Sequence, residues 1–207
     1  MKKLVIATHN PGKLREFLPL LGPLGYELTT SAALNLPAPE ETAPDFAGNA
    51  RLKAVKAAKA SGLPALGDDS GISVAALNGQ PGIYSARYAS DDYPAAFAKI
   101  IAAAKAKDNW TAWFTCALCL AQPDGSTATY IGEVLGRIAP EPRGAEGFGY
   151  DPIFIPKGHE KTFAELGETK ETMSHRARAV EQLRAVLAAQ SQPDAAPLRA
   201  KPSRHPE

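Results

Sequence analysis

Two adjacent aspartates, Asp68 and Asp69, follow a short apolar run and precede Ser70 and Gly71. A run bounded in this way predicts a buried strand that ends at the edge of a site. Neighbouring side chains on a strand point to opposite faces, and adjacent carboxylates repel each other, so the pair suggests that a cation or a proton relay uses at least one of them. Mg²⁺ is the natural cation, because it prefers oxygen ligands and is usually held by one or two carboxylates and substrate phosphates. A solvated turn is the alternative, since Asp, Ser and Gly are also turn residues.

The polar loop His9-Asn10-Pro11-Gly12-Lys13 follows a nearly continuous apolar segment, Lys3 to Thr8. Apolar residues at helical spacing run from Leu14 to Leu21, so the pattern predicts a strand, a loop and a helix. Backbone N–H groups at a helix N-terminus beside Lys13 form a combination that binds phosphate. The GxxxxGK[ST] spacing of a Walker loop is absent, and an ordinary strand-to-helix connection with a surface lysine is the alternative.

A long helix is predicted from Ala43 to Ser61, with Thr42 as its N-cap and Asp45 in the capping-box position. Its small apolar residues keep helical spacing, and Gly62 provides the stop signal.

Four polar residues on or just before this helix are candidates for the same site. Asn49 and Lys53 lie one turn apart and could face a ligand together, although a solvated polar face is the commoner meaning of such a pair. Glu40 and Glu41 could supply a further carboxylate to a metal ion, or could simply complement the positive end of the helix.

The second half of the chain carries a segment suited to a flat ring, Phe148-Gly149-Tyr150-Asp151. Its aromatic residues could stack on the ring while the aspartate fixes a polar edge, or could form a core pair beside a turn. Lys170, Ser174, His175 and Arg176 lie at the start of the last helix, where their donors and the helix terminus favour an anion or carbonyl oxygens. A capping or surface histidine is the alternative there.

The only cysteines, Cys116 and Cys119, have the spacing of a zinc or redox motif. They lie in an aromatic and β-branched segment, Trp110 to Ala121, which predicts a strand and forms a hairpin with Ser126 to Val134. Residues three apart on a strand face opposite sides, so we expect reduced, structural cysteines rather than a shared metal ion.

The whole chain has 207 residues, a formal net charge of +1 and 44% hydrophobic residues, which predicts one globular domain, placed over residues 1–189. The small net charge gives no sign of nucleic-acid or membrane binding, and no apolar run is long enough for a signal sequence or a membrane span, so we expect a cytoplasmic protein. Residues 190–207 lose all periodicity and predict a disordered C-terminal tail.

Six motifs in order give the chain a strong resemblance to the Ham1/RdgB family of inosine triphosphate pyrophosphatases, also called dITP/XTP diphosphatases. The resemblance covers about Lys3 to Ala189 and is far more specific than any single motif. The motifs are Thr8-His9-Asn10-Pro11-Gly12-Lys13, Phe46-Ala47-Gly48-Asn49-Ala50-x-x-Lys53, Gly67-Asp68-Asp69-Ser70-Gly71, Pro81-Gly82-Ile83-Tyr84-Ser85-Ala86-Arg87, Gly147-Phe148-Gly149-Tyr150-Asp151-Pro152 and Ser174-His175-Arg176.

The resemblance implies a two-lobed α/β fold with a long mixed sheet, a nucleotide cleft between the lobes and a homodimeric assembly. It implies hydrolysis of deaminated purine triphosphates such as ITP, dITP and XTP between the α and β phosphates, with Mg²⁺, or Mn²⁺ in its place, as cofactor. The alternatives are a Maf-type nucleotide diphosphatase and a nucleotide-binding sensor that has lost turnover.

The resemblance also implies roles for single residues. Asp69 is the expected metal-linked catalytic carboxylate, with Asp68 and Glu40 or Glu41 as supporting acids and Lys13 as the main phosphate-binding cation. Substrate contacts are expected from Thr8, His9, Asn10, Pro11, Gly12, Asn49, Lys53, Ser70, Phe148, Gly149, Tyr150, Asp151, Lys170, His175 and Arg176, the last two at the base-reading edge.

Two residues depart from the family pattern. His9 stands where many relatives have a small or amide residue, which could alter the phosphate contacts or add a titrating group. Gly48 replaces a commonly acidic residue before Asn49, so no metal role is assigned there.

Overall fold

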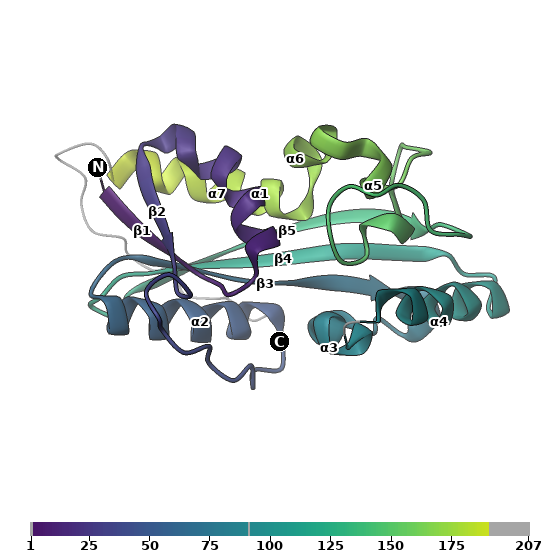
Figure 1. The fold of residues 1–207 in the computed structure, drawn as a ribbon, viewed down its shortest axis with the longest axis horizontal. Coiled ribbons are helices and arrows are strands. Elements are labelled where there is room, and N and C mark those ends of the chain that lie inside the picture. Colours follow the sequence, from purple (N-terminus) through teal and green to yellow (C-terminus); the bar gives the residue numbers. More distant parts are fainter. Residues whose placement is uncertain (1, 91, 191–207) are drawn as a thin grey trace, which may run out of the picture.

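A mixed sheet of six strands forms the centre of the computed structural model, which describes residues 2–90 and 92–190 (Figure 1). The strands are β1 (Lys2–Ala7), β2 (Tyr26–Thr30), β3 (Ala65–Val74), β4 (Thr111–Ala121), β5 (Thr127–Ile138) and β6 (Phe154–Pro156). The α-helices are α1 (Pro11–Leu21), α2 (Phe46–Ser61), α3 (Ser85–Ala89), α4 (Tyr93–Ala106), α5 (Phe163–Leu166), α6 (Lys170–Met173) and α7 (His175–Gln190). Short 3₁₀ turns are η1 (Gly22–Leu24), η2 (Ala75–Leu77), η3 (Gly82–Tyr84), η4 (Asp151–Ile153) and η5 (Gly167–Thr169). Gln190 ends α7, and the rest of the predicted tail, 191–207, lies outside the described residues.

The strand order is β2-β1-β3-β4-β5-β6, with β1 parallel to both β2 and β3 and the remaining pairs antiparallel. The hairpin of β4 and β5 confirms the strand pair predicted from the sequence. The register of β1 on β3 runs from Val5 opposite Ala65 to Ala7 opposite Gly67, after which the chain turns away into α1. Between Gly67 and Ile72 the β1-side edge of β3 is therefore without a strand partner, whereas from Ile72 to Val74 it bonds to the segment 80–85.

The strand that carries the aspartates does not end at them, contrary to the prediction. β3 continues through Asp68 and Asp69 to Val74, because it pairs with β4 along its whole length, from Ala65 opposite Ala121 to Val74 opposite Ala112. Backbone hydrogen bonds to β4 hold the polar residues in extended conformation despite their turn-forming side chains. The two carboxylates thus lie in the part of β3 that has no strand partner on the β1 side.

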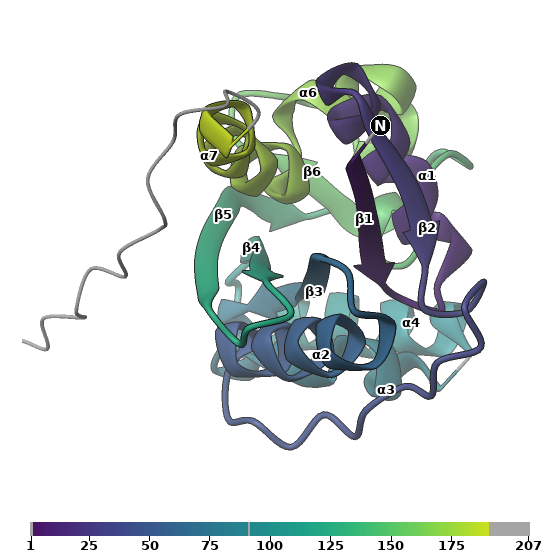
Figure 2. The same ribbon diagram turned by 90° about the vertical axis from the view of Figure 1, so that its left-hand side faces the viewer.

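Helices cover both faces of the sheet. The helices α1, α5, α6 and α7 lie on one face, and α2, α3 and α4 lie on the other (Figures 1 and 2). No helix in the described part of the chain combines the length and the apolar character that crossing a bilayer requires.

Three buried clusters divide the molecule into two lobes. At the start of β3, Leu66 packs into a cluster with α1 and α7 on one face, and Ala65 into an alanine-rich cluster with α2 on the other. Near its end, Ile72 and Val74 pack into a third cluster with α4, β6 and α5. The segment between these anchors carries the aspartates at the junction of the lobes, and the family-implied architecture is confirmed.

The helix α2 begins at Phe46 with Asp45 as its N-cap, so the predicted start at Ala43 with Thr42 as cap is wrong. The Asp45 side chain accepts a hydrogen bond of 2.7 Å from the Gly48 N–H. Pro44 disfavours helical backbone in the residue before it, so Ala43 stays outside the helix.

The helix α2 packs unusually close to β3. A side-chain carbon added at Gly67 would lie 2.0 Å from the Ala50 carbonyl oxygen and 2.8 Å from the Ala54 nitrogen, so only glycine fits there. Alanines on α2 and on the sheet line the rest of the contact. This packing brings the polar face of α2 next to Asp69.

The two cysteines are buried and unpaired on opposite faces of β4. Cys116 packs in the cluster of α1 and α7, whereas Cys119 packs in the cluster of α2, so they cannot bind one metal ion together. The expectation of reduced, structural cysteines agrees with this placement.

Candidate active site

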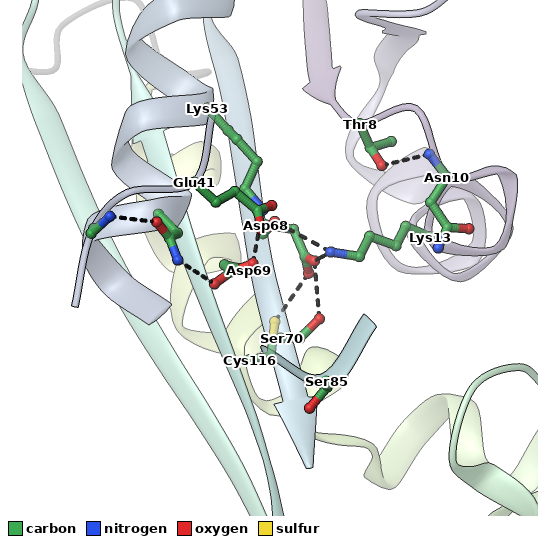
Figure 3. Close-up of polar contacts among 12 residues, drawn as sticks. Thr8, Asn10, Lys13, Glu41, Lys53, Asp68, Asp69, Ser70, Ser85 and Cys116 are labelled. Carbon is green, nitrogen blue, oxygen red and sulfur yellow. Dashed lines mark hydrogen bonds and ion pairs between the residues drawn. The ribbon is translucent and has the colours of Figure 1, made fainter. Parts of the chain in front are cut away.

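The side chains of Asp68 and Asp69 face different groups, as the alternation of a strand requires. Lys13 approaches Asp68 from α1, and Lys53 approaches Asp69 from α2 (Figure 3). Both aspartates border one cavity of about 370 Å³, which reaches both faces because the edge of β3 is open here.

This cavity gathers most of the residues predicted from the sequence. Among the described residues it is lined by Thr8, His9, Asn10, Lys13, Glu41, Lys53, Asp68, Asp69, Ser70, Phe148, Gly149, Tyr150, Asp151, Lys170, His175 and Arg176. Pro11 and Gly12 form the first turn of α1 instead, and Asn49 lies buried behind Asp69. Glu40 is exposed and the cavity reaches Glu41 but not Glu40.

Asp68 is the centre of a buried ion-pair cluster. It pairs with Lys13, accepts a bond of 3.0 Å from the Arg176 Nε, and accepts bonds from the Ser70 hydroxyl (3.1 Å) and the Cys116 thiol (3.2 Å). Burial alone would raise the pKa of Asp68, but the charges of Arg176 and Lys13 hold that pKa well below its usual value. Asp68 is therefore a permanent anion that positions two cations.

A second acid, Glu16 on α1, extends this cluster towards the other end of the cavity. Its carboxylate pairs with Arg176 and, at 2.7 Å, with the Lys170 Nζ, which also lies 2.7 Å from Asp151 Oδ2. The sequence pattern alone does not single out Glu16. The available signal is its place three residues after Lys13, which puts the two side chains on one helix face.

Asp69 lies on the opposite face in a different environment. Its Oδ1 is 2.8 Å from the Lys53 Nζ, and its Oδ2 accepts a 3.3 Å bond from the Asn49 side-chain amide. Burial raises the pKa of Asp69, and the charge of Lys53 offsets this only in part. The Lys53 Nζ also lies 2.8 Å from Glu41 Oε1, so one ammonium bridges two carboxylates.

The loop before α1 is held by its own side chains. The Asn10 side chain accepts a 2.8 Å bond from the Gly12 N–H and so caps the helix, while the Thr8 hydroxyl accepts a 3.0 Å bond from the Asn10 N–H. His9 does more than stand in for a small residue, because its Nε2 lies 2.9 Å from the Leu36 carbonyl oxygen and ties this loop to the segment that carries Glu41. The predicted cation Lys13 lies directly behind this cap.

The segment predicted to bind a flat ring, Phe148 to Asp151, places its two aromatic side chains in different surroundings. Tyr150 is 4% exposed, donates a 2.6 Å bond to the Ser85 carbonyl and packs edge-on against Tyr93, so it is mainly a core residue. Phe148 is only half-buried at the cavity wall, and its backbone N–H donates a 2.9 Å bond to Asp151. Of the two rings, Phe148 is the one available for stacking.

His175 stacks on the Phe114 ring with 4.6 Å between centroids and 9° between planes. Burial and the charges of Arg176 and Lys170 hold its pKa well below the usual value, so the ring is neutral. Its Nδ1 is buried and has no hydrogen-bond partner among the described residues. A buried ring nitrogen without a partner is costly unless a ligand completes it.

The acidic side chains of the cavity provide only part of a metal-binding site. In the described part of the chain, no three His, Cys, Asp or Glu side chains gather closely enough to hold a metal on their own. Asp69 and Glu41 nevertheless converge on one cation, the Lys53 ammonium. Two carboxylates completed by phosphate oxygens are a usual Mg²⁺ donor set, so the residues present fit such an ion when a phosphate ligand is bound.

Known proteins resemble this chain over most of its length. The sequence profile of the Ham1 family matches residues 4–186. A dITP/XTP pyrophosphatase of Caulobacter vibrioides is 51% identical over 190 residues, covering 89% of this chain and 97% of the relative. A dITP/XTP pyrophosphatase of Gluconobacter oxydans is 49% identical over 181 residues, covering 86% of this chain and 87% of the relative.

Solved structures of similar proteins share the fold. A Ham1 protein from Coxiella burnetii superposes with a TM-score of 0.81 at 41% identity, covering 90% of this chain and 98% of that one. The Ham1 protein of Staphylococcus aureus gives a TM-score of 0.81 at 38% identity, covering 91% and 100%. Because the family profile spans most of the sequence and relatives this similar match nearly their whole length, the chain belongs to the Ham1 family.

Proposed function

We propose that the protein hydrolyses non-canonical purine nucleoside triphosphates, namely ITP, dITP and XTP, to the monophosphate and pyrophosphate, and so removes them from the nucleotide pool. The observation that carries the proposal is one cavity lined by two chemically different sets of residues. Lys13, Lys53 and two carboxylates form one set, which we assign to the phosphates and call the phosphate end, and Phe148 with His175 forms the other, which we assign to the base and call the base end. The similarity to dITP/XTP pyrophosphatases supports the same substrate class.

The phosphate end supplies charge neutralisation and a base. Lys13 and Lys53 balance the charge that develops on the phosphate oxygens, next to the N-terminus of α1. Asp69 positions water and accepts its proton. Mg²⁺, or Mn²⁺ in its place, would be held by Asp69 and Glu41 and would supply further positive charge to the phosphates.

The base end provides hydrogen-bond donors for a C6 carbonyl. The neutral His175 ring donates when its unpartnered Nδ1 carries the proton, and Arg176 has five N–H donors, of which contacts to Asp68, Glu16 and Ser70 use four. Hypoxanthine and xanthine carry an acceptor carbonyl where adenine carries an amine, so donors at this position favour them. Phe148 stacks on the ring, and Asp151 with Lys170 fixes its remaining polar edge.

The test is a pyrophosphate-release assay with Mg²⁺ over ITP, XTP, dITP, ATP and GTP. We expect kcat/KM for ITP and XTP to exceed that for ATP by at least about 10²-fold, because a site built to hydrogen-bond one group rejects an analogue that lacks it. A preference for modified pyrimidine triphosphates would favour the Maf-type alternative, and nucleotide binding without product would favour a sensor. A homodimeric assembly and a cytoplasmic location belong to the same proposal and rest on the sequence resemblance and composition.

A further inference from the structure

Lys53 occupies the place between two carboxylates where a cation would bind. Its Nζ lies 2.8 Å from Asp69 Oδ1 and 2.8 Å from Glu41 Oε1, and its side chain is only 11% exposed (Figure 3). The ammonium therefore uses one oxygen of each acid and neutralises part of their charge. A divalent ion cannot enter the pair without meeting this positive charge at close range.

We propose that Lys53 is a resident counter-cation that keeps divalent metal away from Asp69 and Glu41 until a triphosphate draws the ammonium out. This inference rests on the proposed function, because it assumes that the same two acids hold the metal during hydrolysis. It assigns to Lys53 a role besides substrate contact: the site binds metal and triphosphate together rather than metal first.

The surrounding contacts leave both acids in place when Lys53 departs. Asp69 keeps the 3.3 Å bond from the Asn49 amide, which is 1% exposed and fixed on α2. Glu41 keeps its Oε2 within 3.3 Å of the Arg87 Nη2, and the Glu41 carbonyl accepts a second bond from the same nitrogen. A preformed acidic pair thus remains for the metal once the ammonium has moved to a phosphate.

The Lys53 side chain is also placed to make that move. It projects from α2 into the cavity that contains Lys13 and the cap of α1, the region assigned to phosphates. A triphosphate carries several negative charges, so it competes strongly with two carboxylates for one ammonium.

The experiment measures Mn²⁺ binding to nucleotide-free protein, using the loss of the free Mn²⁺ signal in electron paramagnetic resonance. The wild type is expected to bind Mn²⁺ weakly, and Lys53→Met to bind it at least about tenfold more tightly, since a neighbouring positive charge is removed. Lys53→Arg keeps the charge and should stay weak. Lys59→Met, on the exposed side of the same helix, is the matched control and should equal the wild type.

Two further results decide the inference. Adding Glu41→Gln to Lys53→Met should abolish the gain, which locates the metal on the acidic pair. A folded Lys53→Met or Lys53→Gln protein, judged by its thermal melting curve, that binds Mn²⁺ no more tightly than the wild type overturns the proposal, and so does a gain that survives Glu41→Gln. Failure of the proposed function is distinguishable, because it shows as a wild type that releases no pyrophosphate from ITP.

Discussion

Asp68 and Asp69 are neighbours with different tasks, and their surroundings set the difference. Arg176 and Lys13 keep Asp68 ionised, whereas burial raises the pKa of Asp69 and the charges of Lys53 and Lys13 offset this only in part. A carboxylate whose proton affinity is raised suits proton transfer, while one held by two cations suits positioning. We therefore propose that Asp69 takes part in catalysis and that Asp68 positions the cations around it.

This contrast predicts that the same substitution, Asp to Asn, affects activity at Asp69 and stability at Asp68. Asp69→Asn should lower kcat for pyrophosphate release by about 10²- to 10⁴-fold, the range for a positioned base, with the fold intact. Asp68→Asn should reduce the free energy of unfolding by about 3–5 kcal/mol, because it leaves buried cations without their anion. Assays and urea unfolding of both variants check this, and near-normal turnover in Asp69→Asn would reassign the base.

His175 makes stability depend on pH. Its native pKa lies well below the usual value, so as pH falls below about 6.5 the unfolded chain binds a proton that the native state does not. The free energy of unfolding should then fall with pH, by up to about 1.4 kcal/mol per pH unit for this one proton. Urea unfolding between about pH 5 and 7 should show a clear slope in the wild type and in His159→Gln, and a smaller slope in His175→Gln. An unchanged slope in His175→Gln would rule out this residue as its source.

At the scale of elements, the contact between α2 and β3 sets the distance between Lys53 and Asp69. Gly67→Ala would force its new carbon into the backbone of α2, and we expect a loss of about 1–3 kcal/mol in the free energy of unfolding, as for overpacked cores, together with reduced activity. Gly22→Ala is the control, because a carbon added there meets no atom within 4 Å. Equal stability and activity in both variants would contradict the close packing.

The sequence predicts elements well where one periodicity dominates, as in the β4–β5 hairpin and the strand before α1. It misplaces the start of α2, because Thr42 and Asp45 are both good caps and the restriction that Pro44 places on the backbone of Ala43 decides for Asp45. It ends β3 too early, because pairing with β4 overrides turn-forming side chains.

The sequence likewise predicts some residues of the site and misses others. Motif spacing finds the acids and cations, but Glu16 acquires partners only when α1 packs beside α6 and α7. Glu40 and Glu41 are equivalent in the sequence, and only the path of the loop turns Glu41 towards Lys53. Such choices depend on contacts between distant segments, which local patterns do not encode.

At the scale of the whole molecule, a chain of ion pairs crosses the junction of the lobes. It runs from Lys13 through Asp68, Arg176, Glu16 and Lys170 to Asp151, and so links the phosphate end of the cavity to the base end. We therefore expect this chain of ion pairs to hold the proposed phosphate and base ends of the cavity at a fixed separation.

Glu16→Gln should interrupt this chain without changing its shape. We expect the free energy of unfolding to fall by about 1–3 kcal/mol, since two buried cations lose a shared partner, and KM for ITP to rise. Glu27→Gln is the matched control, because the exposed Lys3–Glu27 pair, at 3.8 Å, contributes little. A Glu16→Gln protein with unchanged stability and KM would show that the chain is not needed to align the two ends.

The most direct test of the central claim is product analysis of ITP and ATP hydrolysis by the wild type in the presence of Mg²⁺. The account predicts IMP and pyrophosphate in equal amounts from ITP, with kcat/KM at least about 10²-fold above that for ATP. Release of IDP and inorganic phosphate, or equal turnover of ATP, would contradict it.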